Sequence, residues 1–446
     1  MGMATRHRYS SISRRATHLF AAGLLARRAA ETVQGRRCTA WSDARRSSVA
    51  ADNGDGSGRL VVVVPLYQEQ QIAGDAVAYW RTLVQTAEID EVIFVTTAKE
   101  LDAGQPTTQA LLAEVLARAP ESRLRHVHCT TVTRFRAAQL NLAVSDARDR
   151  YCCGESGEAG VWIGVYNADS RPQASTFREL RQCARLWKET RAYQQLARYV
   201  VPDRPGVSWV AGGNAVLQTW WTRTHYWARN TRGGGSPHWR ASTSPFSTFG
   251  HGEFIRLDLL DEVGGFPDFA YADGLLLGWI IRLMDEPIGL LASTDNAEVP
   301  RTACDLLTQQ GAWMRGLLNF GATMRWAREC GRLRLAAPEA AMLRCQHMII
   351  PIAWGLSTPA VAAGMALVIG RFRRGQATWA DAACLLGLAS YPIIPALASA
   401  AEDSDASWPL RPIATASSWM VEGLAFWPAL LSHLRKSQAA PAKTPR

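Results

Sequence analysis

The sequence predicts an α/β protein in which a mostly parallel sheet is covered by helices and is followed by apolar helices. Strand-like and helix-like stretches alternate between residues 59 and 166, as is typical of parallel strands joined by right-handed crossovers. Polar residues follow the apolar run at 160–165, and ligands of open α/β sheets collect at the carboxyl ends of strands. Long uncharged runs occupy the C-terminal part of the chain.

The first 58 residues are predicted to be a disordered, Arg- and Ser-rich extension and linker. Of the net charge of +10 in 446 residues, the first fifty carry +8, as ten arginines against Glu31 and Asp43. The apolar stretch at 18–26 is too short to span a bilayer, so a transit-like or membrane-touching segment is the alternative to disorder. The rest of the chain shows no basic groove, which argues against nucleic-acid binding. Nine cysteines without a Cys-x-x-Cys pair indicate a reducing compartment.

The folded α/β domain is predicted to begin at Arg59 and to end near residue 316. Strands are expected at residues 60–64, 91–97, 124–130 and 160–166, where β-branched and other apolar residues form short runs. Helices are expected between them, at residues 72–87, 108–119 and 136–150. Because these strands read as apolar throughout, both faces of the sheet are expected to be covered.

Residues 345–370 and 382–401 contain no Asp, Glu, Lys or Arg, and each run is long enough to cross about 30 Å of hydrocarbon. A third candidate, 413–434, contains Glu422, which is costly at mid-bilayer. We therefore expect two to three membrane helices within 345–434. They are preceded by an amphipathic interfacial segment at 317–344 and followed by a basic tail at 435–446. Two alternatives stay open: buried core helices, and a re-entrant hairpin broken at Pro351 and Pro359.

The segment GVYNADSRP (164–172) places the carboxylate of Asp169 directly after a predicted buried strand. A polar turn explains Asn, Asp, Ser and Pro at this position equally well. A ligand site is the functional alternative, because a carboxylate at a strand end suits a hard cation.

Six segments in order resemble the family 2 glycosyltransferases, in particular the membrane-bound, cellulose- and hyaluronan-synthase-like branch. They are VVVVPLYQEQ (61–70), RAAQLN (136–141), YNADS (166–170), GHGEFIR (250–256), GGFPDFAYADGLLLG (264–278) and QQGAWMRG (309–316). The resemblance covers residues 59–316. It implies a GT-A fold, which is a Rossmann-like nucleotide-sugar-binding domain, and a nucleotide-sugar donor, with a UDP-sugar expected.

The resemblance also implies a divalent metal, Mg²⁺ or Mn²⁺, that neutralises the departing nucleoside diphosphate. The family motif is Asp-x-Asp, and here Asn167 replaces the first Asp while Asp169 matches the second. Asn167 still offers a carbonyl oxygen but less charge, so weaker metal binding is expected.

Donor-binding residues are carried over in the same way, segment by segment. They are Pro65, Tyr67, Glu69, Arg136, Asn141 and Asp169. For Arg136, an exposed helix cation is the structural alternative.

The general base of the family is the Asp of a Glu-Asp pair, and here it corresponds to Asp273, preceded by Ala272 where Glu is usual. One well-placed carboxylate is enough to deprotonate an acceptor hydroxyl. A helix N-cap is the structural alternative for Asp273, because an apolar run follows it.

The segment QQGAWMRG resembles the Gln-x-x-Arg-Trp element that binds acceptor or diphosphate. Gln309 and Trp313 match, Ala312 stands where Arg is expected, and Arg315 is a substitute for that cation. The missing Arg weakens the case for processive synthesis. An aromatic cluster nearby is expected to line an acceptor channel, to sit at a lipid interface, or simply to pack in the core; its members are Trp209, Trp220, Trp221, Tyr226, Trp227 and Trp239.

Together these features predict an inverting, metal-dependent hexosyltransferase on a multi-pass membrane protein whose catalytic domain faces the cytoplasm. Its acceptor would be a saccharide, a lipid-linked molecule or another hydroxyl compound, and its partners include membrane lipid but no nucleic acid. The alternative is a catalytically weakened, membrane-anchored sugar-binding or scaffold protein, favoured by Asn167, Ala272 and Ala312. A transporter-like membrane protein is a third and weaker alternative.

Overall fold

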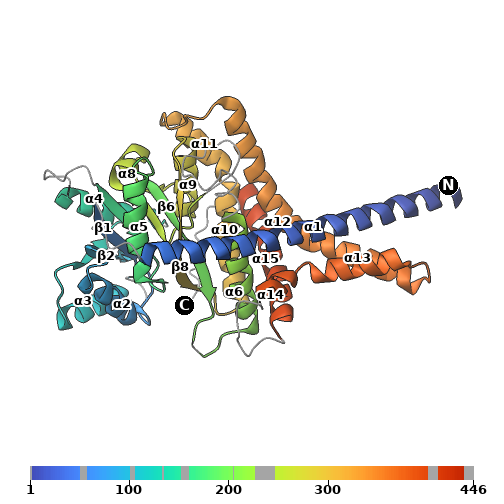
Figure 1. Cartoon of the computed structure of the whole chain (residues 1–446), viewed down its shortest axis with the longest axis horizontal. Helices are drawn as coiled ribbons and strands as arrows, with labels where there is room; N and C mark the ends of the chain where they lie inside the picture. Colours follow the sequence, from blue (N-terminus) through green and yellow to red (C-terminus); the bar gives the residue numbers. More distant parts are fainter. Residues whose placement is uncertain are drawn as a thin grey trace.

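The computed structural model describes residues 3–50, 58–100, 106–132, 135–151, 160–203, 205–226, 247–399 and 410–435. An eight-stranded sheet and its covering helices form one side of the molecule, and a group of long helices forms the other (Figure 1). A mixed α/β architecture is therefore confirmed.

The sheet has the strand order β3-β2-β1-β4-β7-β6-β8-β5. The strands are β1 Arg59–Pro65, β2 Glu91–Thr97, β3 Leu124–Cys129, β4 Val161–Val165, β5 Arg171–Pro172, β6 Ala192–Val200, β7 Glu253–Arg256 and β8 Gly289–Glu298. Strands β1 to β4 pair in parallel, as do β6 and β8, whereas β7 runs antiparallel to its neighbours β4 and β6. The four strands expected from the sequence are present within one residue at each end.

Alternate side chains of the strands enter two separate apolar cores, because successive strand residues point to opposite faces. Val61 and Val63 of β1 pack with α4 and α9 on one face. Val62 and Val64 pack with α2, α3 and α5 on the other. The helices concerned are α2 Ala73–Gln85, α3 Thr108–Arg118, α4 Ala137–Tyr151, α5 Ala174–Leu186, α8 Leu257–Val263 and α9 Asp273–Leu283.

The remaining helices form the second part of the molecule. They are α1 Met3–Ala50, α6 Trp209–Trp221, α10 Ala303–Leu318, α11 Phe320–Glu329, α12 Ala337–Arg373, α13 Trp379–Ser390, α14 Ile394–Ser399 and α15 Arg411–Leu434. Helix α15 packs against α6, α10 and α12.

The expectation of a disordered N-terminal extension is wrong for residues 3–50, which form the single helix α1. This helix runs from the sheet to α13 and extends beyond it (Figure 1). Asp381 at the start of α13 accepts from Arg371 Nη1 at 2.7 Å and pairs with His18 Nε2 at 3.0 Å, so α1 is tied to α12 and α13. A helix that is held by polar contacts has no apolar repeat in its sequence. The Arg- and Ser-rich composition of this segment therefore suggests disorder. The linker residues 51–57 lie outside the described residues.

The segment 317–344 was expected to lie at a membrane interface, but the apolar face of α11 within it is already covered. Phe320, Met324 and Ala327 are buried in one cluster with Trp279 and Leu283 of α9. This amphipathic helix therefore packs on the sheet domain. Of the basic tail at 435–446, only Arg435 is described.

Among the described residues, α12 is the one helix long and apolar enough to cross a membrane. It continues through Pro351 and Pro359, so the re-entrant hairpin is wrong. The run at 382–401 is broken into the short helices α13 and α14, and does not form one long helix. Two to three membrane spans were expected from the sequence, but among the described residues one helix is long enough and apolar enough to be a span.

Candidate functional site

Arg136, just before α4, joins three segments that are far apart in the sequence. Its Nε and Nη2 donate to Asp273 Oδ2 at 3.2 and 2.8 Å. Its Nη1 donates to Asn167 Oδ1 at 3.1 Å, and its Nη2 also donates to the carbonyl of Gly250 at 2.9 Å. The guanidinium therefore fixes the positions of the turn after β4, the loop before β7 and the start of α9.

The loop before β7 can approach Arg136 only because residue 250 is glycine. Gly250 has φ +82°, and a Cβ there would lie 2.6 Å from Arg136 Nη2 and close to Gly274. A side chain at this position would push the guanidinium away from Asp273. The GHGEFIR segment thus needs its first glycine to close the site.

Asp273 is the first residue of α9 and is 8% exposed. Ala272 is the N-cap residue of α9 and has the left-handed φ of +64°, and the helix has no side-chain cap. Asp273 directs its carboxylate to Arg136 instead. The helix-cap alternative for Asp273 is therefore wrong.

Ala272 occupies a crowded place, because α10 passes close to it. A Cβ on Gly316 of α10 would lie 2.6 Å from the Cβ of Ala272. Arg315, one residue earlier, stacks over the ring of Tyr271 at 5.7 Å. The QQGAWMRG helix is therefore packed on the loop that carries Asp273, and burial lowers the pKa of Arg315.

Asp169 is 5% exposed and accepts from the backbone N–H of Glu298 at 3.2 Å. A second carboxylate, Asp295 of β8, is fully buried nearby and accepts from Ser170 Oγ at 2.8 Å. His251 Nδ1 lies 3.1 Å from Asp295 Oδ2. Burial raises the pKa of Asp295, and the negative charge of Asp169 adds to the rise.

Glu253, the first residue of β7, is a carboxyl group that the sequence did not single out. It is completely buried, and among the described residues neither of its oxygens has a partner at hydrogen-bond geometry. A Cβ on Gly274 would lie 3.0 Å from Glu253 Oε2, which places the group beside the start of α9. Burial raises the pKa of Glu253 to about 7; the nearby Thr248 hydroxyl opposes the rise, the negative charge of Asp273 adds to it, and Arg136 and His251 also oppose it.

A divalent cation would find one buried carboxylate, Asp169, with Asp295 beside it. Within the described ranges, no group of three or more His, Cys, Asp or Glu side chains is arranged to hold a metal ion by itself. Mg²⁺ is commonly held by one or two carboxylates together with phosphate oxygens of a substrate, so this donor set fits a cation bound with a phosphorylated ligand. Asn167 fits less well, because its Oδ1 already accepts from Arg136.

The other predicted residues are placed differently. The side-chain amide of Asn141 donates through Nδ2 to the carbonyl of Phe266 and accepts through Oδ1 from its N–H. It therefore holds the turn after α8 in place. Pro65 ends β1, while Tyr67 and Glu69 follow it, with Lys99 Nζ 5.9 Å from the ring of Tyr67. Gln309 and Trp313 lie half-buried on α10.

Of the aromatic cluster, Trp220 is buried and Trp221 is half-buried, whereas Trp209 is exposed. Trp227, Trp239 and the side chain of Tyr226 lie outside the described residues.

No model of a known protein family matches the sequence, and no curated protein matches it. Among solved structures the chain is similar to the mannosyltransferase PcManGT from Pyrobaculum calidifontis, solved in complex with GDP-Man and Mn²⁺. The identity is 16%, the match covers 93% of this chain and 100% of that chain, and the TM-score is 0.48. A likeness at this level does not establish a shared fold or activity.

Proposed function

We propose that the protein is a glycosyltransferase that moves a sugar from a nucleotide-sugar donor to an acceptor hydroxyl. The observation that carries this proposal is the single guanidinium of Arg136 bound to both Asn167 and Asp273. The residues that resemble the metal motif and the base motif of family 2 enzymes are 106 positions apart in the sequence, yet they share one hydrogen-bond partner. We also propose that residues 59–316 form a GT-A glycosyltransferase domain.

Asp273 is the proposed general base. Both bonds from Arg136 end on Oδ2, so we assign proton transfer to Oδ1. The acceptor O–H proton passes to Oδ1 while the acceptor oxygen forms a bond to the anomeric carbon. The bond from that carbon to the diphosphate oxygen breaks, and its electron pair leaves with the nucleoside diphosphate. A single displacement of this kind inverts the anomeric configuration.

Arg136 is proposed to orient the base. Its two hydrogen bonds to one carboxylate oxygen fix the rotation of the Asp273 side chain. Asp169 would hold a divalent cation, Mg²⁺ or Mn²⁺, which neutralises the charge that develops on the departing diphosphate. Pro65, Tyr67 and Glu69, at the end of β1, are proposed to contact the nucleoside.

We further propose that the protein acts at a membrane through α12, with its sheet domain on the cytoplasmic side. The support is the length and apolar composition of α12, of which 22% is buried over its most apolar window.

A screen of UDP-, GDP- and dTDP-sugars with Mg²⁺ or Mn²⁺ tests the proposal. The purified full-length chain should release nucleoside diphosphate from at least one donor, and Asp169→Ala should abolish the release. A scaffold or sugar-binding protein would bind a donor and release nothing, and that result would replace the enzyme by the alternative. Activity that persists in excess chelator would remove the metal from the mechanism.

A further inference from the structure

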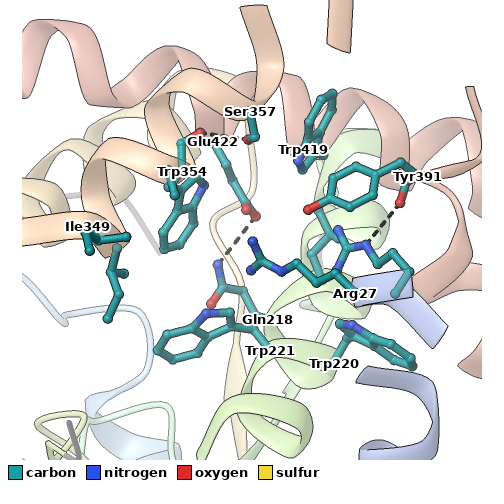
Figure 2. A pocket seen from close by; sticks show the side chains of 14 residues that line it. Arg27, Gln218, Trp220, Trp221, Ile349, Trp354, Ser357, Tyr391, Trp419 and Glu422 are labelled. Carbon is teal, nitrogen blue, oxygen red and sulfur yellow. Dashed lines mark hydrogen bonds between the residues drawn. The ribbon is translucent and has the colours of Figure 1, made fainter. Parts of the chain in front are cut away.

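A pocket of about 220 Å³ lies among the helices on the α12 side of the molecule, and Trp220 and Trp221 of the aromatic cluster line it. Helices α1, α6, α12 and α15, together with Tyr391, form its walls. Figure 2 shows Trp354 and Trp221 on one side, Tyr391 and Trp419 on the other, with Gln218 and Glu422 between them. Four tryptophans and a tyrosine line the pocket together with a few polar side chains. Such a lining suits a sugar ring, because the ring has apolar faces and hydroxyl groups at its edges.

The pocket adjoins the candidate site through a short line of aromatic rings. The ring of Trp221 lies 6.3 Å from that of Phe249, which stacks on His251 at 6.2 Å. His251 in turn contacts Asp295, the carboxylate beside Asp169. The side chains of Phe249 and His251 therefore connect the wall of the pocket to Asp295, and Phe249 directly precedes Gly250, whose carbonyl Arg136 binds.

The two guanidiniums in the wall of the pocket are already paired. Arg27 and Arg28 both donate to the carboxylate of Glu31, at 2.8 and 2.6 Å. Arg28 also donates to the carbonyl of Tyr391 at 3.1 Å. Because Glu31 engages both cations, the described wall of the pocket offers no unpaired positive charge to a phosphate, which favours an uncharged, hydroxyl-bearing head.

One edge of the pocket is apolar and open. Ile349 lines the pocket and is 62% exposed, and the neighbouring residues Met348, Ile352 and Leu356 of α12 are each about half exposed. Met348, Ile352 and Leu356 recur every four residues and so follow one face of the helix. An aliphatic chain that leaves the pocket past Ile349 would lie along this face.

We infer that this pocket binds the acceptor, and that the acceptor is an amphiphile with an uncharged sugar head in the aromatic pocket and an aliphatic tail along α12. This inference rests on the proposed function, since it assigns the acceptor of that reaction. It narrows the acceptor from any hydroxyl compound to a glycolipid.

The test uses full-length protein in lipid nanodiscs and the octyl glycosides of glucose, mannose and galactose as probes, with binding measured by calorimetry. Ala353→Trp should fill the pocket, and the exposed position of Ala353 on α12 allows the variant to fold. Ala363→Trp is the matched control, an exposed alanine of the same helix outside the pocket.

We expect saturable binding of at least one octyl glycoside, weakened by about ten-fold or more in Ala353→Trp, an effect of roughly 1.4 kcal/mol, and unchanged in Ala363→Trp. The methyl glycoside of the same sugar should bind more weakly, because it lacks the tail. Octyl phosphate and octanol should not compete with the glycoside.

Equal binding in the two tryptophan variants, or competition by octyl phosphate or octanol, would overturn the inference. Nucleoside diphosphate release from the donor without any acceptor reports on the proposed function separately. If that release persists while no glycoside binds, the acceptor site is wrong and the enzyme stands. If glycoside binds at the pocket but no donor is ever cleaved, the proposed reaction is the part that fails.

Discussion

Glu253 places a fully buried carboxyl group beside the start of α9, which begins at the proposed base Asp273. Nothing in the segment GHGEFIR indicates that this carboxyl group is buried. Burial follows from β7 running antiparallel between β4 and β6, with Val165 opposite Glu253. His251 and Asp295 were missed for the same reason, because the contact between them joins positions 44 apart.

By contrast, Arg136, Asn167, Asp169 and Asp273 were singled out from motifs, and the structure brings three of them together around one guanidinium. Motifs predict which residues matter. Motifs do not predict hydrogen bonds within the protein. Asn141, for example, was expected to bind the donor but pairs with the backbone of Phe266.

A first prediction concerns stability and Glu253. Its pKa rises from an ordinary 4.5 to about 7 in the folded protein, so the folded state binds this proton more tightly than the unfolded state. Stability is therefore present below about pH 4.5 and is lost as pH rises through about 7, by about 3 kcal/mol in total. Asp273, Arg136 and His251 are the titratable side chains whose charges act on this group.

Glu253→Gln removes the titrating proton and keeps the shape of the side chain. The variant should have a higher Tm than the parent at about pH 8 and a similar one at about pH 4, as measured by calorimetry across that range. An identical pH dependence of Tm in both proteins would show that Glu253 is ionised at neutral pH.

A second prediction concerns the base. Asp273→Asn should lower turnover by roughly two to four orders of magnitude, the range expected for loss of a general base, with donor affinity nearly unchanged. Steady-state kinetics and donor titration measure the two quantities. Near-parental turnover with an intact fold would leave the site without a base.

A third prediction concerns the metal. Asn167→Asp adds a carboxylate where Arg136 now donates to an amide oxygen, so the variant should retain activity and reach half-maximal rate at lower Mn²⁺. Rates measured over a range of metal concentrations test it. A higher metal requirement in Asn167→Asp than in the parent would contradict a metal-ligand role for the side chain at position 167.

At the level of elements, the strands of the sheet were predictable and the helices around α12 were not. Residues 91–97 form a strand with the expected limits, because a short β-branched run between turns has few alternative structures. Helix α1 has no apolar stripe, and its order depends on contacts such as that of Arg28 with the carbonyl of Tyr391, 363 residues away. Local patterns do not contain such information.

Glycines set how closely the helices approach. A Cβ on Gly213 of α6 would lie 2.0 Å from the carbonyl oxygen of Ala414 and 2.6 Å from the N of Thr415 in α15, whereas one on Gly212 would meet nothing within 4 Å. Backbone atoms cannot move aside as side chains do. A substitution at Gly213 thus tests close packing between helices, whereas the same substitution at Gly212 tests helix propensity alone.

A fourth prediction follows from this pair. Gly213→Ala should lower stability by about 1–3 kcal/mol through overpacking against α15. Gly212→Ala should leave stability unchanged or raise it by up to about 1 kcal/mol, because alanine is the better helix former. Tm values of the two variants give the comparison, and equal Tm values would mean that α15 does not dock on α6 in solution.

For the whole molecule, the distribution of exposed apolar side chains separates the two parts. On α12 and α15 large exposed apolar residues recur on one face of each helix, for example Met348, Ile352 and Leu356, and Met420, Leu424 and Leu431. Such side chains are sparse on the sheet domain, where Leu186 and Val201 are examples. An extended apolar face of this kind marks a surface that contacts lipid or another protein.

The fifth prediction is that this face holds the full-length protein at a membrane. Removal of everything after residue 335 would be a poor test, because it would uncover Asn214 and Gly213 of α6, which α15 covers. Substitution of lysine at Ile352, Leu356 and Leu367 leaves the buried contacts of α12 in place, since all three side chains are more than 40% exposed.

Each lysine in a hydrocarbon layer costs about 2.5–3.5 kcal/mol, so the triple variant should move to the soluble fraction after an alkaline carbonate wash. The parent should stay with the membrane pellet. Lysine at Val132, Leu186 and Val201, which are at least as exposed on the sheet domain, is the matched control and should stay with the pellet too. Release of the parent by the wash would place the protein outside the bilayer, and the exposed face of α12 would then need a protein partner to cover it.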